Sequence, residues 1–242
     1  MTTKRLFLSK KDDFDTQISK SLSWILRHGA HKLQLPIDSE GFIDLVAVIS
    51  SESLQGKCTL EDIQRIVKNN DKQRFTIRRN CFTNKLEIRA NQGHSIQTVT
   101  SLELIPIKPD FKSDIIHGTY HRFWPKIKEI GLSRMNRVHI HFTTAIPKGK
   151  EHVISGMRNN CGIYIYIDFP KAFESGLQFF MSSNKVILSP GNDNGIIEPK
   201  YFLKIIDVKT AAAMAVVYDI FRPTLNDEQV ENSDSAGKNM SK

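Results

Sequence analysis

The sequence is poor in cysteine. Its three cysteines, Cys58, Cys81 and Cys161, are odd in number, lie far apart and never form a CxxC pair. Disulfide frameworks use even sets of cysteines and zinc sites use closely spaced pairs, so the pattern favours neither, and we expect no bound metal. We interpret the three side chains as reduced thiols of an intracellular protein, located in the cytoplasm, the nucleus or both.

Long apolar runs are also absent. No stretch reaches the 18 or so consecutive apolar residues that suggest a membrane-spanning helix. The first residues, MTTKRLFLSKKDDFD, contain only a short apolar segment before charges resume, which is not the pattern of a signal peptide. We therefore expect neither membrane insertion nor secretion. The hydrophobic content of 40% is that of a globular chain, which excludes disorder along its whole length.

Several familiar catalytic signatures are missing. The sequence has no HExxH, GxSxG, GxxxxGK[ST] or GxGxxG string, so zinc protease, serine hydrolase, P-loop and Rossmann mechanisms lack their parts. What the chain has instead is positive charge: 34 Lys and Arg against 26 Asp and Glu give a net charge of +8. This excess favours a polyanionic partner such as nucleic acid.

The first hundred residues combine helical and strand periodicity. The segment 18–29 has helical spacing, ends at Gly29 and carries the basic pair Arg27-His28 in its last turn; further helices are predicted over 45–49 and, after an N-cap at Thr59, over 60–67. Apolar and polar residues then alternate on both sides of a turn at 80–85, which predicts a hairpin. Three helices followed by a two-stranded wing indicate a winged-helix lobe. Such lobes bind nucleic acids or proteins, so topology alone leaves both open.

A change of composition marks a boundary near residue 106. The segment LIPIKPDFKS (104–113) has two prolines and little periodicity, which is typical of a linker. Beyond it we predict a helix ending at Gly131, strands at 139–142, 163–169, 185–189 and 201–208, and helices after Pro170 and before Pro223. The predicted class is α+β, with an N-terminal extension (1–15), a winged-helix lobe (16–105), a linker (106–113), a β-rich lobe (114–223) and a disordered tail (224–242).

Four basic features stand out from this framework. They are Arg27-His28 at a helix end, Arg74 at the start of a strand, the string His117-Gly118-Thr119, and Arg137 followed by His139 and His141. Arginines with a histidine suit a phosphate dianion, because guanidinium groups make charge-assisted, bidentate hydrogen bonds. Each feature alone also has a structural interpretation: a helix C-terminus favours cations, a strand edge tolerates a solvated arginine, and histidines alternating with apolar residues pack in cores.

Taken in order, the strings that contain these residues resemble the RNA 2′-phosphotransferase family, the enzymes that complete tRNA splicing in eukaryotes. The resemblance runs from about Ile18 to about Tyr218. Its pieces are SKSLSWILRH, DSEGFI, NDKQRF, ANQGHS (90–95), IHGT, MNRVHIHF, VISGMR (153–158) and VILSPG (186–191).

The resemblance implies an activity and a site. It implies that NAD⁺ accepts the internal 2′-phosphate of ligated tRNA in two steps, giving 2′-hydroxyl RNA, nicotinamide and ADP-ribose 1″,2″-cyclic phosphate. It also implies an ADP-ribosyltransferase-like second lobe, and we expect a monomer. The family's catalytic tetrad falls on Arg27, His28, Arg74 and Arg137; Arg134 is close, but the spacing to the HxH string favours Arg137. The NAD⁺ pocket falls on His117, Gly118, Thr119, His139, His141 and Arg158.

Two other functional classes remain open. A winged-helix transcription regulator would explain the first lobe and the charge but leaves IHGT and MNRVHIHF without a role, and specific duplex binding would support it. An ADP-ribosyltransferase acting on protein or on terminal nucleic-acid phosphates would share the NAD⁺ lobe. Mass spectrometry of the product separates this alternative, because it leaves a stable ADP-ribosyl group instead of releasing a cyclic phosphate.

Overall fold

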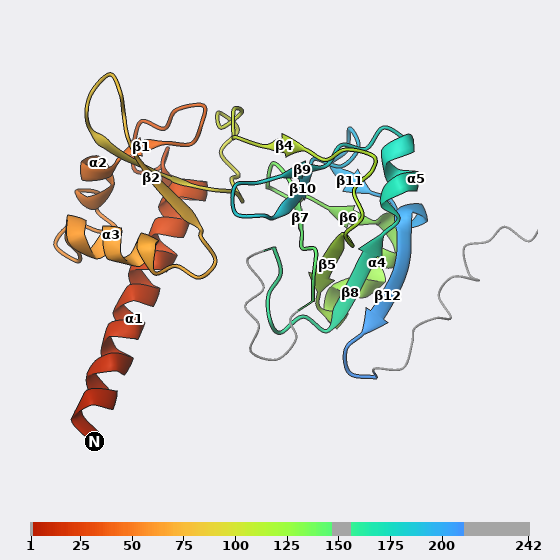
Figure 1. Cartoon of the computed structure of the whole chain (residues 1–242), viewed down its shortest axis with the longest axis horizontal. Coiled ribbons are helices and arrows are strands. Elements are labelled where there is room, and N and C mark those ends of the chain that lie inside the picture. The colour runs from red at the N-terminus through yellow and green to blue at the C-terminus, as the bar shows by residue number, and fades with distance from the viewer. Residues whose placement is uncertain (1, 147–155, 211–242) are drawn as a thin grey trace, which may run out of the picture.

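A computed structural model describes residues 2–146 and 156–210, with side chains from Asp13 onward. Helices and strands are mixed, which confirms the predicted α+β class (Figure 1). The described residues form two large hydrophobic cores, one from residues 18–99 and one from residues 107–205, and a smaller cluster around Met157. We call the parts built on the two large cores the N-terminal lobe (13–102) and the C-terminal lobe (105–207). The predicted helix before Pro223 and the tail 224–242 lie outside the described residues.

The N-terminal lobe packs helices against a small antiparallel sheet of order β1-β3-β2. The predicted helices and hairpin are confirmed, but the first helix begins at Thr2, well before Ile18, where its apolar stripe starts. The elements are α1 (Thr2–Trp24), the π-helix η1 (Ile25–Gly29), β1 (Ile43–Asp44), α2 (Leu45–Ile49), α3 (Leu60–Lys68), β2 (Phe75–Arg79) and β3 (Leu86–Ala90).

The last turn of the first helix is widened into a π-turn. Gly29 closes it beneath the indole of Trp24, where a Cβ would lie only 2.5 Å from a ring carbon. Ile25 and Leu26 fill the core on one side of the turn. Arg27 and His28 therefore point away from the core, in the kind of helical bulge that often occurs at functional sites.

Local contacts stabilise the rest of this lobe. Thr59 caps α3, as predicted: its hydroxyl accepts a hydrogen bond from the Asp62 N–H at 3.2 Å, and the Asp62 carboxylate accepts one from the Thr59 N–H at 3.1 Å. The acidic turn DSEGFI bonds to β2, because Arg78 binds Glu40 at 2.6 Å and covers the ring of Phe42 at 3.6 Å. This turn thus has a structural contact of its own.

The C-terminal lobe contains two main antiparallel sheets, ordered β4-β9-β10-β7 and β12-β8-β5. Paired backbone hydrogen bonds between Ile116 and Thr143, each 2.9 Å long, join β5 to the end of β7 and thereby connect the sheets. The strands are β4 (Ile105–Pro106), β5 (Ile116–Thr119), β6 (Leu132–Ser133), β7 (Ile140–Phe142), β8 (Ile163–Ile167), β9 (Phe180–Met181), β10 (Ile187–Ser189), β11 (Ile196–Ile197) and β12 (Phe202–Asp207); the helices are η2 (His121–Phe123), α4 (Trp124–Ile130), α5 (Phe169–Glu174) and η3 (Pro199–Tyr201).

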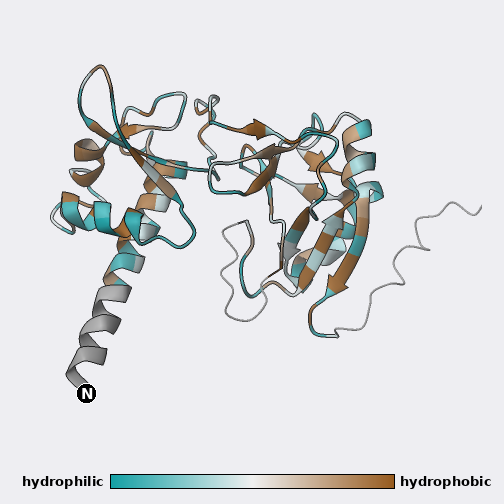
Figure 2. Ribbon diagram, viewed as in Figure 1, coloured by the Kyte–Doolittle hydropathy of each residue, from teal (hydrophilic) through white to brown (hydrophobic). Residues whose placement is uncertain are grey.

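Two details of this lobe differ from the sequence-based prediction. The proline-containing segment predicted as a linker begins in β4, which pairs with β9, and its Ile107 is buried in the second core. The helix predicted after Pro170 ends already at Glu174, because Gly176 turns the chain with a φ of +87°. Strands β8 and β12 are largely apolar and contribute to the second core, whereas α3, which packs on the first core, is polar over much of its surface (Figure 2).

Hydrogen bonds between described residues connect the lobes. The Val138 N–H, just before β7, donates to the His94 carbonyl at 3.0 Å. The Asn184 side-chain amide, in the turn between β9 and β10, donates to the Lys72 carbonyl at 3.1 Å. Figure 1 shows this turn projecting from the C-terminal lobe toward the N-terminal lobe.

A pair of glycine substitutions tests the backbone of the C-terminal lobe. Gly131 and Gly176 both have positive φ, +96° and +87°, but a Cβ on Gly131 collides with the Ile197 carbonyl, whereas one on Gly176 meets nothing within 4 Å. We expect Gly176→Ala to cost about 1–2 kcal/mol of unfolding free energy from strain alone, and Gly131→Ala about 3 kcal/mol or more. Urea unfolding of both variants measures this, and equal losses would contradict the collision.

Candidate active site

The π-turn and the segment after β3 hold Arg27 and His28. The Ser95 N–H donates to the Arg27 carbonyl at 2.9 Å, and the Ser95 hydroxyl lies 2.9 Å from Nδ1 of His28. Because that hydroxyl also reaches the Arg27 carbonyl, at 3.4 Å, it can accept from Nδ1–H. Nε2 of His28 is then the nitrogen left for a ligand. Gly93, with a φ of +90°, lets the backbone pass beside the Arg27 side chain, since a Cβ there would lie 3.4 Å from Cδ of Arg27.

Arg74 stands at the entrance to β2 and is held by two asparagines. Asn70 Oδ1 accepts from the Arg74 N–H at 3.1 Å and from its Nη1 at 3.4 Å. The Asn91 side chain donates to the Gln73 carbonyl at 2.7 Å, and its backbone N–H donates to the Arg74 carbonyl at 2.8 Å. The residue before Arg74 is thereby kept at a φ of +43°, which non-glycine residues rarely adopt.

Arg137 is supplied by the other lobe. It precedes Val138, whose N–H bonds to the His94 carbonyl, so Arg137 lies beside the segment that holds Arg27 and His28. Arg134 instead supports this turn from behind, because its Nη1 donates to the Arg137 carbonyl at 3.1 Å and its side chain crosses Gly195. The structure thus brings Arg137 toward the predicted cluster and uses Arg134 to shape the turn.

Mutual repulsion shows that the four predicted catalytic residues lie within electrostatic range. Burial, then Arg74, then Arg137 lower the pKa of Arg27 to about 10. Burial, then Arg137, then Arg27 lower the pKa of His28. Nε and Nη2 of Arg27 are buried without a hydrogen-bond partner among the described residues. A partly desolvated group of like charges with free N–H donors is an environment that favours an anion.

His117 and His141 face the cluster from the connected sheets. Nδ1 of His117, on β5, lies 2.9 Å from the His141 carbonyl on β7. Burial, then Arg137, then Arg27 lower the pKa of His141, and its Nε2 is buried with no partner in the described part of the chain. A Cβ at Gly118 would collide with the Met157 side chain and lie 2.8 Å from Sγ of Cys161, so these side chains would have to shift. Thr119 follows and is buried at the end of β5.

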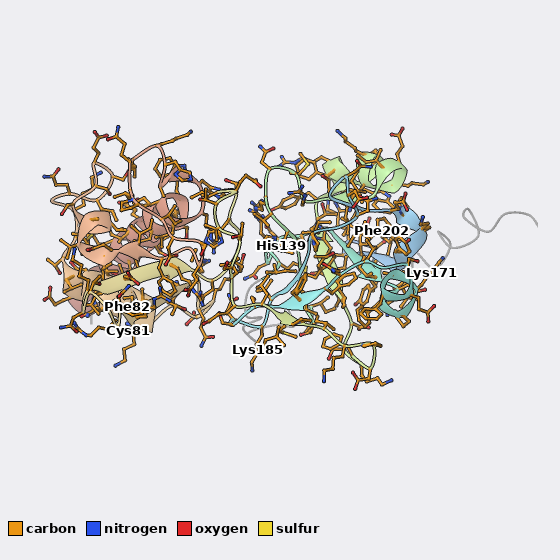
Figure 3. The ribbon with its side chains drawn as sticks, turned by 90° about the horizontal axis from the view of Figure 1, so that it is seen from above. Cys81, Phe82, His139, Lys171, Lys185 and Phe202 are labelled. Carbon is orange, nitrogen blue, oxygen red and sulfur yellow. The ribbon has the colours of Figure 1, made fainter. Side chains whose placement is uncertain are left out.

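The two remaining pocket candidates lie at the edge of this group. His139 packs edge-on against Phe180, with 6.4 Å between ring centres, and burial, then Arg134, lower its pKa to about 4. Arg158 is exposed and donates to the Tyr120 hydroxyl at 3.2 Å, yet it is close enough to lower the pKa of Arg137. Figure 3 shows His139 on the side of the C-terminal lobe that faces the N-terminal lobe. The roles of all ten residues stay predictions.

His94 was not predicted as a site residue. It is 1% exposed, and neither ring nitrogen has a hydrogen-bond partner within the described ranges. Burial, then Arg27, lower its pKa to about 3, so its ring is neutral at pH 7. The string ANQGHS, a polar run with a glycine directly after a strand, was the available signal for His94, Asn91 and Ser95. The turn that contains Asn184 offered no comparable one.

The structure adds two findings on other types of site. Within residues 2–146 and 156–210, no group of three or more His, Cys, Asp or Glu side chains is placed to hold a metal ion. In the same ranges, no helix has the length and apolarity needed to cross a membrane.

Comparison with known proteins decides the family. The model of the RNA 2′-phosphotransferase, Tpt1 / KptA family matches residues 13–191, a span that includes the whole basic cluster. The chain belongs to the RNA 2′-phosphotransferase family. It is therefore a transferase, and the predicted family is confirmed.

Named members of the family match most of the chain. The tRNA 2′-phosphotransferase 1 of Danio rerio is 45% identical over 191 residues, covering 78% of this chain and 84% of the fish protein. That of Homo sapiens is 43% identical and covers 83% of this chain and 79% of the human protein. The tRNA 2′-phosphotransferase of Saccharomyces cerevisiae is 43% identical and covers 74% of this chain and 80% of the yeast protein.

The buried His94 makes the stability of this family member pH-dependent. Its pKa is about 3 when folded and near 6.5 when unfolded, so the unfolded chain binds more protons and stability falls as pH drops from about 6.5 toward 3. By pH 5 this one group removes about 2 kcal/mol. We expect the loss of unfolding free energy between pH 7 and pH 5 to be smaller by about that amount in His94→Gln. Equal losses in both proteins, measured by urea unfolding, would refute this.

Proposed function

We propose that this chain is an NAD⁺-dependent RNA 2′-phosphotransferase that removes the internal splice-junction 2′-phosphate from ligated tRNA. Its products are 2′-hydroxyl RNA, nicotinamide and ADP-ribose 1″,2″-cyclic phosphate. One observation carries the proposal: three arginines and a histidine from both lobes converge, with buried Arg27 N–H groups that have no partner among the described residues. The relatives' names support a tRNA substrate.

The phosphate is bound by the cluster itself. Arg27 offers Nε and Nη2, and Arg74 and Arg137 approach from opposite lobes. A dianion in this position relieves the repulsion that lowers the pKa of Arg27, so binding is favoured electrostatically before any specific hydrogen bond is counted. Three guanidinium groups around one phosphate also stabilise negative charge that develops on its oxygens during transfer.

The residues opposite the cluster suit the ribose of NAD⁺. The NAD⁺ co-substrate supplies an electrophilic ribose carbon that carries nicotinamide as its leaving group. His141 has a buried Nε2 with no partner in the described structure, and the Met157 side chain packs closely against Gly118. His117 is held by its Nδ1 contact and keeps Nε2 for a ligand. These groups, with Thr119, His139 and Arg158, bind and orient the ribose.

His28 donates a proton to the RNA 2′-oxygen when the phosphate leaves it. Burial, then Arg137, then Arg27 lower the pKa of His28, so its ring is neutral at pH 7 in the free site. A bound phosphate dianion neutralises those arginines and raises the pKa of His28, so the ring gains a proton only when substrate is present. Ser95 fixes Nδ1, which leaves Nε2–H to donate to the departing 2′-oxygen of the RNA.

Finer features of the architecture belong to the same proposal. The helices α1–α3 followed by the β2–β3 hairpin support a winged-helix lobe over 16–105, and the two connected sheets support an ADP-ribosyltransferase-like NAD⁺-binding lobe over 114–223. We also propose that the protein is an intracellular monomer.

A single incubation tests the function. The pure protein is mixed with an RNA that carries one internal 2′-phosphate, with and without NAD⁺, and products are identified by mass spectrometry. We expect dephosphorylated RNA and a cyclic phosphate of ADP-ribose only when NAD⁺ is present. Phosphate loss without NAD⁺, or an RNA that stays ADP-ribosylated, would overturn the proposal.

In the first step the RNA 2′-phosphate displaces nicotinamide from the ribose of NAD⁺, and in the second step the ribose 2″-hydroxyl attacks the phosphorus and the RNA 2′-oxygen leaves. The arginines should act mainly on this second step. Charge then builds on oxygens that Arg74 and Arg137 contact, so Arg74→Ala and Arg137→Ala should each slow this step by roughly 10²–10³-fold and let ADP-ribosylated RNA accumulate. Lysine should rescue only in part, because it lacks the bidentate fork. Arg79→Ala, at the far end of β2, is the matched control. Single-turnover gels follow both steps, and equal slowing of the two would mean simple RNA binding.

A further inference from the structure

The turn between β9 and β10 reaches across to the N-terminal lobe through one buried side chain. Asn184 is 1% exposed, although its neighbours Ser183 and Lys185 in the turn are exposed. Its Oδ1 accepts from the Ser182 hydroxyl at 2.8 Å, which fixes the orientation of the amide. Its Nδ2 then donates to the Lys72 carbonyl at 3.1 Å. Figure 3 shows the labelled Lys185 on the side of the C-terminal lobe toward the N-terminal lobe.

The segment that Asn184 contacts is the one that presents Arg74. Lys72 is followed by Gln73, whose φ of +43° is sparsely populated and persists only where surrounding contacts hold it. Asn70 and Asn91 hold this segment from within the N-terminal lobe, through the Arg74 N–H and the Gln73 carbonyl. Asn184 supplies the third amide contact, and it comes from the lobe that carries the NAD⁺-pocket candidates.

We propose that Asn184 is a positioning residue for Arg74, through which the C-terminal lobe sets the place of a phosphate-binding arginine in the N-terminal lobe. The inference rests on the proposed role of Arg74 in binding the RNA 2′-phosphate. Loss of the amide frees the Lys72 carbonyl, the strained Gln73 relaxes, and the Arg74 guanidinium moves off the phosphate while the rest of the cluster stays in place.

The β9–β10 hairpin also contacts the segment that contains Arg137. Phe180, on β9, packs against His139, two residues after Arg137. The β9–β10 hairpin therefore touches the Arg137 segment with its strand and the Arg74 segment with its turn. One hairpin thus contacts the segments of both arginines, which come from opposite lobes. This gives the buried Asn184 a function beyond closing its own turn.

A double-mutant cycle tests the proposal on the full-length chain. It uses the wild type, Asn184→Ala, Arg74→Ala and the double variant, with Ser183→Ala as the control from the same turn. The first readout is affinity without NAD⁺, expressed as the ratio between a 2′-phosphorylated oligonucleotide and its 2′-hydroxyl counterpart. We expect Asn184→Ala to reduce this ratio by about tenfold, the effect of one lost hydrogen bond on geometry, and to leave it unchanged in the Arg74→Ala background. Ser183→Ala should behave as wild type.

The second readout is the single-turnover time course with NAD⁺. Asn184→Ala should slow the second step more than the first, and its effect should be smaller than that of Arg74→Ala. The double variant should be no slower than Arg74→Ala. Additive losses in the double variant would overturn the proposal, because Asn184 would then act apart from Arg74. The proposal would also be overturned if the Arg74→Ala variant had the same affinity ratio and the same rates as the wild type. Should Asn184→Ala fail to fold, Asn184→Leu keeps a side chain of similar shape at this buried position and removes the donor without adding a charge. If the wild type bound the 2′-phosphorylated oligonucleotide more tightly than its 2′-hydroxyl counterpart but never removed the phosphate, only the proposed function would be contradicted, and the positioning role of Asn184 would remain testable by affinity.

Discussion

Electrostatic repulsion among Arg27, Arg74 and Arg137 is the constraint around which the molecule is built. Burial, then Arg74, then Arg137 lower the pKa of Arg27 to about 10. Burial also lowers the pKa of Arg74, and Asp71 counters that effect only in part. The chain holds the three arginines together through hydrogen bonds to backbone atoms: the Ser95 N–H donates to the Arg27 carbonyl, the Arg74 N–H donates to Asn70 Oδ1, and the Val138 N–H donates to the His94 carbonyl. Because backbone atoms fix the positions, charged side-chain atoms remain available to an anion.

The two lobes contribute different parts of the candidate site. The N-terminal lobe gives the π-turn with Arg27 and His28 and the asparagine-held entrance to β2. The C-terminal lobe gives Arg137 and the histidines at the junction of its two sheets. Each lobe has a separate hydrophobic core, so neither core depends on the charged cluster. The unfavourable electrostatics are therefore confined to the surface where the lobes meet.

Sequence reasoning succeeded where one strong local pattern decides the structure. The stripe and cap of α3 and the apolar run of β8 needed no distant partner to be recognised. It failed where the partner decides. Strands β4 and β9 have two residues each and form because they pair with each other. The start of α1 at Thr2 was missed because the residues of this helix that belong to the core begin only at Ile18. The cluster came from a resemblance, since spacing alone does not bring residues 27, 74 and 137 together. Asn184 escaped notice because an asparagine in a turn is ordinary until its partner across the lobes is known.

The π-turn at Ile25–Gly29 also sets a rotational phase. In an α-helix each residue advances about 100° around the axis, whereas a π-turn fits an extra residue into one turn. Removing one residue here would restore the α-helical count and swing everything after the deletion by about that angle. The imidazole of His28 would leave Ser95, and the glycine beneath Trp24 would leave the indole. The number of residues in this turn is therefore as important for the site as the identity of Arg27 and His28. An insertion or deletion here would misplace the site residues even if every one of them were kept.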